Sequence, residues 1–391
     1  MLHTVAIRGY RSMREVVIPM AGLTVVTGAN GSGKSSVYRS LRLLADCGRG
    51  EVIGSLAREG GLESVLWAGP EQPADGHGTD EQRSLRPQGT TRTRPISLEL
   101  GFASDDFGYL IDLGLPQDAG LGSYFARDPE IKREAVFAGP RLRPSSTLVR
   151  RGRDYAEVAA ESGHGFDELT RSLPPYRSVL AEYAHPGALP ELATVRDRLR
   201  DWRFYDGFRV DADAPARRPR VGTRTPVLSD DGGDLAAAIQ TILEAGFDDL
   251  PRAVADAFDA AEVSVAVHDG LFELQLHQRG MLRPLRAAEL SDGTLRFLLW
   301  AAALLSTRPP SLMVLNEPET SLHPDLVAPL AAMIRAAAAG TQVVVVTHSR
   351  AMREQLDSGD AQEIELYKQW GETRIAGQTM LTAPPWDWGR R

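Results

Sequence analysis

The feature that most constrains this chain is a glycine-rich stretch near its start. Residues Gly28-Ala29-Asn30-Gly31-Ser32-Gly33-Lys34-Ser35 fit the phosphate-loop pattern G-x-x-x-x-G-K-[ST]. Residues 23–27 before it are β-branched and apolar, which is typical of a strand buried on both faces. After it, Val37, Leu41 and Leu44 recur at helical spacing until Gly48, a suitable C-cap. A strand, a glycine loop and a helix in this order are the context that the pattern requires.

This stretch has the chemistry of a nucleoside triphosphate site. Its glycines let backbone N–H groups turn toward phosphate oxygens, and the helix start adds its positive end. Lys34 would reach the β- and γ-phosphates, and the Ser35 hydroxyl would be a magnesium ligand. The alternative is a glycine-rich turn that matches by chance, which happens on the order of 1% of the time in a chain this long. We expect ATP to contact Gly28, Ala29, Asn30, Gly31, Ser32, Gly33, Lys34, Ser35 and Ser36.

Composition limits the class of protein further. A chain of 391 residues suffices for two domains, or for one large domain with an insertion. It has no apolar run approaching 18 residues and no signal segment, and its lone cysteine, Cys47, excludes an internal disulfide. These features predict a cytoplasmic protein without membrane association. The net charge of −8 means that any nucleic-acid contact needs a local basic patch. No zinc-ligand spacing is present.

The rest of the chain reads as alternating sheet and helix. Strands are expected over 2–8 and 15–20, hairpins over 96–113, 262–276 and 363–376, and helices over 235–245 and 250–258. Residues 69–95 are rich in glycine, proline and charge, which is typical of a long exposed loop.

The middle of the chain carries three arginine clusters. They are Arg141, Arg143, Arg150, Arg151 and Arg153; Arg196, Arg198, Arg200 and Arg203; and Arg217, Arg218, Arg220 and Arg224. Acidic residues are interleaved with the second cluster and adjoin the third. Solvated faces are therefore the default interpretation, and contact with nucleic acid is the alternative.

Two later motifs have the chemistry of a second half-site. Ser291, Asp292 and Gly293 precede an apolar helix over 295–305, where Ser291 is a natural N-cap and Gly293 leaves the backbone open. Such a helix start can bind phosphate, although an ordinary capped helix has the same sequence. The apolar strand 311–315 then ends in Asn316 and Glu317, where phosphate-loop ATPases carry a magnesium-associated carboxylate and a general base.

A third buried strand, 342–346, ends in Thr347-His348-Ser349, and a polar turn occupies 321–325. Polar residues at strand ends of open α/β sheets are where ligands bind, although a surface Glu or a structural His gives the same pattern.

Taken together, Gly28 to Ser36, Leu290 to Thr294, Leu312 to Pro324 and Val343 to Ser349 resemble ABC-type ATPases of the SMC/RecF-like class, close to RecF-type and OLD-type heads. The resemblance implies an α/β phosphate-loop ATPase head with a mixed sheet core and an antiparallel β lobe. Residues 1–115 and 261–391 would form the head, and 116–260 a mixed, largely helical, arginine-rich insertion.

The resemblance also implies a homodimer that sandwiches two ATP molecules with Mg²⁺. Gly28 to Ser36 of one head would hold the triphosphate, with Lys34 taking part in catalysis. Ser291, Asp292 and Gly293 of the other head would cap the γ-phosphate. Glu317 would activate water, His348 would sense the γ-phosphate, and Ser35 and Asn316 would lie at the metal.

This chain departs from the family pattern at two positions. Asp292 replaces a signature glycine, and Asn316 replaces the usual magnesium-associated Asp. An amide offers an oxygen without charge, so slow turnover is expected. The glutamine that usually couples the γ-phosphate to the partner-sensing lobe is not recognisable in the sequence.

Three functions follow from these features. The first is an Mg²⁺-dependent ATPase acting on DNA in repair, recombination or defence against foreign DNA. The second is a slow or non-hydrolysing ATP switch that recruits a protein partner, as Asn316 suggests. A transporter ATPase is disfavoured by the roughly 255 residues between Lys34 and Ser291. About 40 residues follow His348, too few for a nuclease fold, so any nuclease is expected to be a separate polypeptide.

Overall fold

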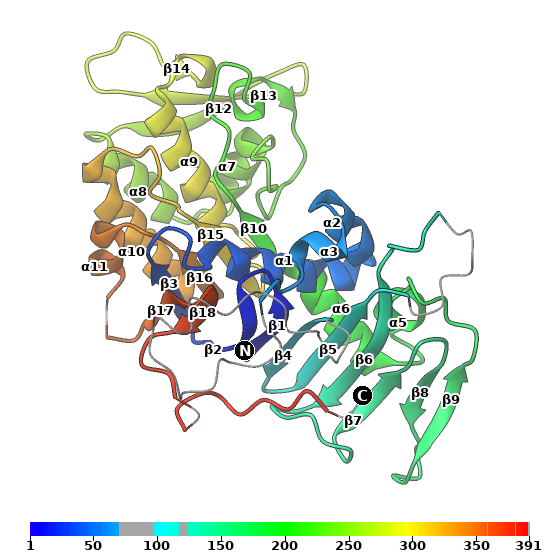
Figure 1. The fold of residues 1–391 in the computed structure, drawn as a ribbon. Coiled ribbons are helices and arrows are strands. Elements are labelled where there is room, and N and C mark those ends of the chain that lie inside the picture. Colours follow the sequence, from blue (N-terminus) through cyan, green and yellow to red (C-terminus); the bar gives the residue numbers. More distant parts are fainter. Residues whose placement is uncertain (70–96, 117–123, 358, 380, 390–391) are drawn as a thin grey trace. The chain divides into compact units, whose positions relative to one another are not determined.

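The computed structural model describes residues 1–69, 97–116, 124–357, 359–379 and 381–389. The chain forms two compact units (Figure 1). The parallel-sheet unit contains Met1, Met20–Ala29 and Asp201–Glu365, and the antiparallel unit contains Leu2–Pro19, Asn30–Arg200 and Leu366–Arg391. The division falls inside the glycine loop, after Ala29. The segment 116–260, expected as one insertion, is shared between the two units, because residues 130–170 add strands to the antiparallel sheet whereas residues 203–205 join the parallel sheet.

A parallel sheet forms the centre of the first unit. Its strands run in the order β10 (Arg203–Tyr205), β15 (Leu312–Asn316), β16 (Gln342–Val346) and β3 (Leu23–Gly28), and β17 (Gln362–Gln369) lies next to β3. The apolar runs of β15 and β16 are buried, as strands covered on both faces require. Because the first four strands are parallel, their carboxyl ends lie at one edge of the sheet.

Helices and a small sheet complete this unit. The helices are α7 (Leu235–Glu244), α8 (Asp249–Ala257), α9 (Asp292–Leu304), α10 (Val327–Ala338) and α11 (Arg350–Leu356). As its mostly apolar sequence predicts, α9 is buried on most faces, between α7, α8 and α10. The small sheet holds β11 (Arg220–Val221), β12 (Glu262–His268), β13 (Leu271–His277) and β14 (Leu285–Arg286). The hairpin β12–β13 and the helices α7, α8 and α9 confirm the corresponding sequence predictions.

The antiparallel unit is built on one eight-stranded sheet. The strand order is β2 (Met13–Pro19), β1 (Leu2–Tyr10), β4 (Leu98–Ser104), β5 (Phe107–Gly114), β6 (Glu130–Ala138), β7 (Thr147–Arg151), β8 (Ala156–Ala159) and β9 (Phe166–Thr170). The helix after the glycine loop, α1 (Lys34–Arg49), packs on β1 and β4. Further helices are α2 (Val52–Arg58), α3 (Leu62–Val65), α5 (Val179–Tyr183) and α6 (Pro190–Asp201).

The end of the chain also belongs to the antiparallel unit. The second half of β17 pairs with β18 (Glu372–Ile375), and Trp386 and Trp388 stack on one another beside Ala6 and Leu110 of the sheet. Cys47 is fully buried in α1, as expected for a small apolar residue. The loop predicted for 69–95 lies, except for Gly69, outside the described residues. No helix in the described ranges is long and apolar enough to cross a membrane.

Candidate nucleotide site

The glycine loop leads from β3 into α1 with a backbone that favours glycine. Gly28, Gly31 and Gly33 have φ angles of 140°, 78° and 114°, a region that side chains disfavour. No side chain caps the start of α1, where Gly33 is the N-cap, so the helix start is suited to an anion. Lys34 is 6% exposed, whereas Ser35 is exposed.

Thr373 of β18 supports the second half of this loop from behind. Its Oγ1 donates to the Ser32 carbonyl at 2.7 Å and lies 2.7 Å from Ser12 Oγ, and its N–H donates to the Ser12 carbonyl at 2.8 Å. A Cβ added to Gly33 would lie 2.5 Å from Thr373 Oγ1, so no larger residue fits there. Sequence reasoning missed Thr373, because about 340 residues separate it from the loop that it supports.

The strand-end edge of the parallel sheet brings together the ends of β3, β15 and β16. Asn316 is in register with Val346, and Val346 with Val26, so Gly28, Glu317 and His348 all follow the same edge. Glu317 Oε1 lies 3.0 Å from His348 Nδ1, and these side chains are 36% and 50% exposed. The carboxylate is therefore oriented by a hydrogen bond and still open to solvent.

The backbone of Glu317 is strained in a way that suits a functional position. Its φ is 47°, in the left-handed region, while its N–H donates to the Val346 carbonyl at 2.7 Å. Left-handed backbone at a residue other than glycine costs about 1–3 kcal/mol, so the surrounding contacts must enforce it.

A second carboxylate, Glu319, holds the strand end that carries His348. Thr347 Oγ1 donates to Glu319 Oε1 and accepts the Ser349 N–H at 2.9 Å. Ser349 in turn caps α11 by accepting the Met352 N–H. Glu319 was not predicted, and its position two residues after Glu317 was the only available signal.

The start of α9 carries Ser291, Asp292 and Gly293, which are called the signature residues below. Ser291 Oγ accepts the Thr294 N–H at 3.1 Å, which confirms the predicted N-cap. A Cβ on Gly293 would lie 3.9 Å from the Ser321 carbonyl, with no closer neighbour, so the backbone there is open. This helix start therefore adjoins the turn that follows Glu317.

Arg217 holds the signature residues in place, and no local pattern distinguishes it from the other arginines of its cluster. Its guanidinium donates to the carbonyls of Leu290 at 2.8 Å and Ala287 at 3.0 Å, and to Asp292 Oδ1 at 2.6 Å. The Arg217 side chain is 8% exposed, whereas Asp292 is 67% exposed. Asp292, which replaces a signature glycine, therefore forms an ion pair with the buried Arg217 of the same unit.

Most of the clustered arginines have structural partners. The ion pairs are Arg150–Glu157, Arg151–Glu134, Arg153–Glu130, Arg196–Asp197, Arg198–Asp106, Arg217–Asp292, Arg218–Asp213 and Arg224–Glu244. The pair of Arg151 with Glu134 is fully buried. The acidic residues interleaved in the sequence therefore neutralise much of the predicted basic surface.

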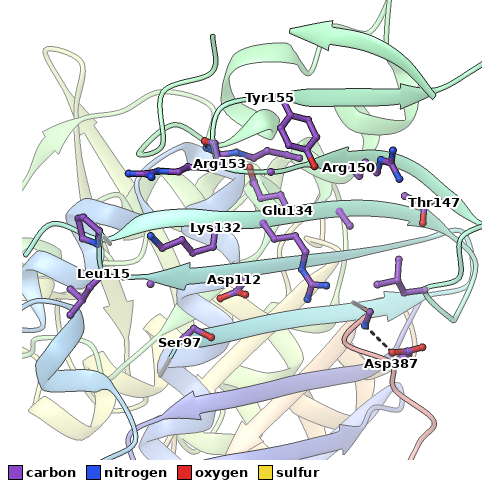
Figure 2. Close-up of a pocket in the computed structure, with 18 of the residues that line it drawn as sticks. Ser97, Asp112, Leu115, Lys132, Glu134, Thr147, Arg150, Arg153, Tyr155 and Asp387 are labelled. Carbon is purple, nitrogen blue, oxygen red and sulfur yellow. Dashed lines mark hydrogen bonds and ion pairs between the residues drawn. The ribbon is translucent and has the colours of Figure 1, made fainter. Parts of the chain in front are cut away.

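A large cavity of about 1790 Å³ lies on the antiparallel sheet, and it contains no residue of the glycine loop, β15 or β16 (Figure 2). Figure 2 shows Lys132, Glu134, Arg150 and Arg153 around it. Lys132 and Arg153 both pair with Glu130, and Arg150 pairs with Glu157, so the charges of these three cations are already balanced. Its size alone does not make it the nucleotide site.

The residues at the loop and strand ends fit ATP and Mg²⁺ chemically. The uncapped helix start and glycine loop suit phosphates, and the Ser35 hydroxyl, Asn316 amide and Glu317 carboxylate are hard oxygen donors. No group of three or more His, Cys, Asp or Glu in the described ranges could hold a metal by itself. Magnesium usually keeps waters and phosphate ligands and needs few protein groups.

One solved structure supports the fold of an ATPase head. An SMC head bound to the C-winged helix domain of ScpA matches with a TM-score of 0.51 and 14% identity, covering 97% of this chain and 98% of that one. An Smc head with an extended coiled coil, bound to the C-terminal domain of ScpA from Pyrococcus furiosus, matches with a TM-score of 0.49 and 13% identity, covering 98% and 97%. The SMC head domain from Thermotoga maritima matches with a TM-score of 0.47 and 12% identity, covering 97% and 99%. Only the first of these structures has a TM-score above 0.5, and at 14% identity it supports the fold alone.

Fold and motifs together define an ABC-type ATPase head of the SMC/RecF-like class. Comparison with curated protein sequences gives no match. The family is settled by residues 23–351, which match the family described as "AAA domain, putative AbiEii toxin, Type IV TA system". The chain belongs to this family.

Proposed function

We propose that this protein is a Mg²⁺-dependent ATPase whose two copies close head to tail around two ATP molecules. The observation that carries the proposal is the strand-end edge, where Glu317 and His348 lie 3.0 Å apart beside the end of the β3 strand that leads into the glycine loop. A carboxylate that is hydrogen-bonded, partly exposed and at the sheet edge where β3 leads into the glycine loop is suited to take a proton from water.

Each predicted residue has a role in this proposal. Gly28 to Ser36 bind the triphosphate, with Lys34 on the β- and γ-phosphates. Ser35 and Asn316 hold the magnesium ion, which neutralises phosphate charge when it is bound. Glu317 accepts the proton of the attacking water, and His348 orients Glu317 and reads the γ-phosphate. Ser291, Asp292 and Gly293 reach the γ-phosphate of the other copy.

We further propose that the closed dimer acts on DNA in the cytoplasm, with any effector or nuclease supplied by a separate protein. Within the described ranges, Arg141 and Arg143 are exposed and make no ion pair, so they are the cluster members best suited to phosphate contacts. The paired arginines contribute less to such a surface, because their charge is already balanced.

ATP turnover with and without DNA tests the proposed function. Turnover of the wild type would be measured with duplex DNA, with single-stranded DNA and without DNA, at moderate salt, beside a Lys34→Ala control. Turnover above that control and stimulated by DNA is the expected result. Tight ATP binding with turnover equal to the control would instead select the ATP switch, which Asn316 favours.

Replacing Arg217 with alanine is expected to weaken ATP-driven dimerisation about tenfold or more. The change removes the donor that fixes the Leu290 carbonyl and Asp292, so the signature is no longer held in position. Hydrogen bonds to charged groups contribute about 1.5–3 kcal/mol each. Sedimentation with ATP measures the dimer.

The matched control for this prediction is Arg218→Ala. Arg218 is the adjacent arginine, but its side chain is 62% exposed and pairs with the exposed Asp213. It is expected to dimerise like the wild type. Equal dimerisation of both variants would refute the role of Arg217.

A further inference from the structure

Asp206 lies at the strand-end edge, next to Asn316, the residue that replaces the usual magnesium-associated Asp. It follows directly after β10, whose Tyr205 is in register with Leu315, so Asp206 is level with Asn316. The Asn316 Nδ2 group donates a hydrogen bond to Asp206 Oδ1 at 2.5 Å. Asp206 is exposed to solvent, and within the described part of the chain no lysine or arginine pairs with its carboxylate.

This bond determines which end of the Asn316 amide is free. An ionised carboxylate only accepts hydrogen bonds, so the amide nitrogen must face Asp206. The amide carbonyl oxygen is then the end left for another partner. An oxygen turned out from the end of β15 is the kind of ligand that a hard cation prefers.

The same contact brings the negative charge of Asp206 next to Asn316, whose own amide is uncharged. A carboxylate one hydrogen bond away from the amide still attracts a nearby cation, although less strongly than a carboxylate at position 316 itself, because the attraction falls with distance. Asp206 shares the sheet edge with Glu317, and both side chains are accessible.

We propose that Asp206 supplies the negative charge on the metal side of the ATP site that Asn316 lacks. Asp206 and Asn316 act together, one giving the charge and the other a fixed carbonyl oxygen. Asp206 is therefore a positioning residue that acts through Asn316. This inference rests on the proposed function, because it assumes an ATP and Mg²⁺ site at this edge.

The test is the Mg²⁺ dependence of ATP binding, measured with a fluorescent methylanthraniloyl ATP and increasing MgCl₂. Asp206→Asn keeps an oxygen that can accept the Asn316 bond and removes only the charge. It is expected to raise the Mg²⁺ concentration for half-maximal binding about tenfold, while binding of the same nucleotide in EDTA stays unchanged. The double variant Asp206→Asn with Asn316→Asp moves the charge to position 316 and is expected to restore the wild-type value within about threefold.

The control is Asp213→Asn, which removes an exposed carboxylate of the same segment that pairs with Arg218. It is expected to behave like the wild type. A shift below twofold for Asp206→Asn, with Mg²⁺-dependent binding by the wild type, would overturn this inference alone. A wild type that binds no nucleotide with or without Mg²⁺ would overturn the proposed function as well. Melting curves in EDTA confirm that each variant is folded.

Discussion

Replacing Glu317 with glutamine is expected to lower the kcat for ATP hydrolysis by about 10²–10⁴-fold, the usual contribution of a general base. Glutamine preserves the size of the side chain and can still hydrogen-bond to His348, but it cannot accept the proton of the attacking water. ATP binding is expected to remain, so the ATP-bound dimer should accumulate. Single-turnover hydrolysis and sedimentation with ATP measure the two effects.

Glu354→Gln is the control for this experiment. Glu354 is an exposed glutamate of α11 that pairs with Arg350. Its removal should change neither turnover nor dimerisation. If Glu317→Gln retained turnover within about twofold of the wild type, Glu317 would not be the base. A Glu317→Gln protein that stayed monomeric at saturating ATP would remove the head-to-tail dimer from the proposal.

Replacing Gly33 with alanine is expected to weaken ATP binding at least about 100-fold. The new Cβ would lie 2.5 Å from Thr373 Oγ1 and 2.9 Å from its Cγ2, and the φ of 114° is unfavourable for alanine. The loop must shift, and with it the backbone N–H groups at the start of α1. Titration with the fluorescent ATP analogue measures the loss, and a melting curve separates it from unfolding.

Gly31→Ala separates the backbone cost of a positive φ from the steric contact with Thr373. Gly31 also has a positive φ, of 78°, but a Cβ there would meet no atom within 4 Å. Only the backbone cost of about 1–2 kcal/mol remains, which corresponds to roughly a 5- to 30-fold loss. Equal losses for the two variants would show that Thr373 does not constrain the loop.

The local elements of the site could be predicted from neighbouring residues in the chain. The strand and helix flanking Gly28 to Ser36, the buried α9 with its Ser291 cap, and the strands ending at Asn316 and Val346 were all predicted. Each depends on residues close together in the chain: a period of apolar side chains, a capping hydroxyl, or a glycine that permits a positive φ. The resemblance to SMC/RecF-like ATPases rests on the same local motifs.

Only the tertiary structure revealed Thr373 behind Gly33, Arg217 beneath Asp292, and Asp206 beside Asn316. Their partners lie about 75 to 340 residues away in the sequence. Such contacts depend on which strands pair and which helices pack, and no local pattern encodes that choice. The three-residue β10 illustrates this, since it is too short to have a recognisable period and is placed by its pairing with β15.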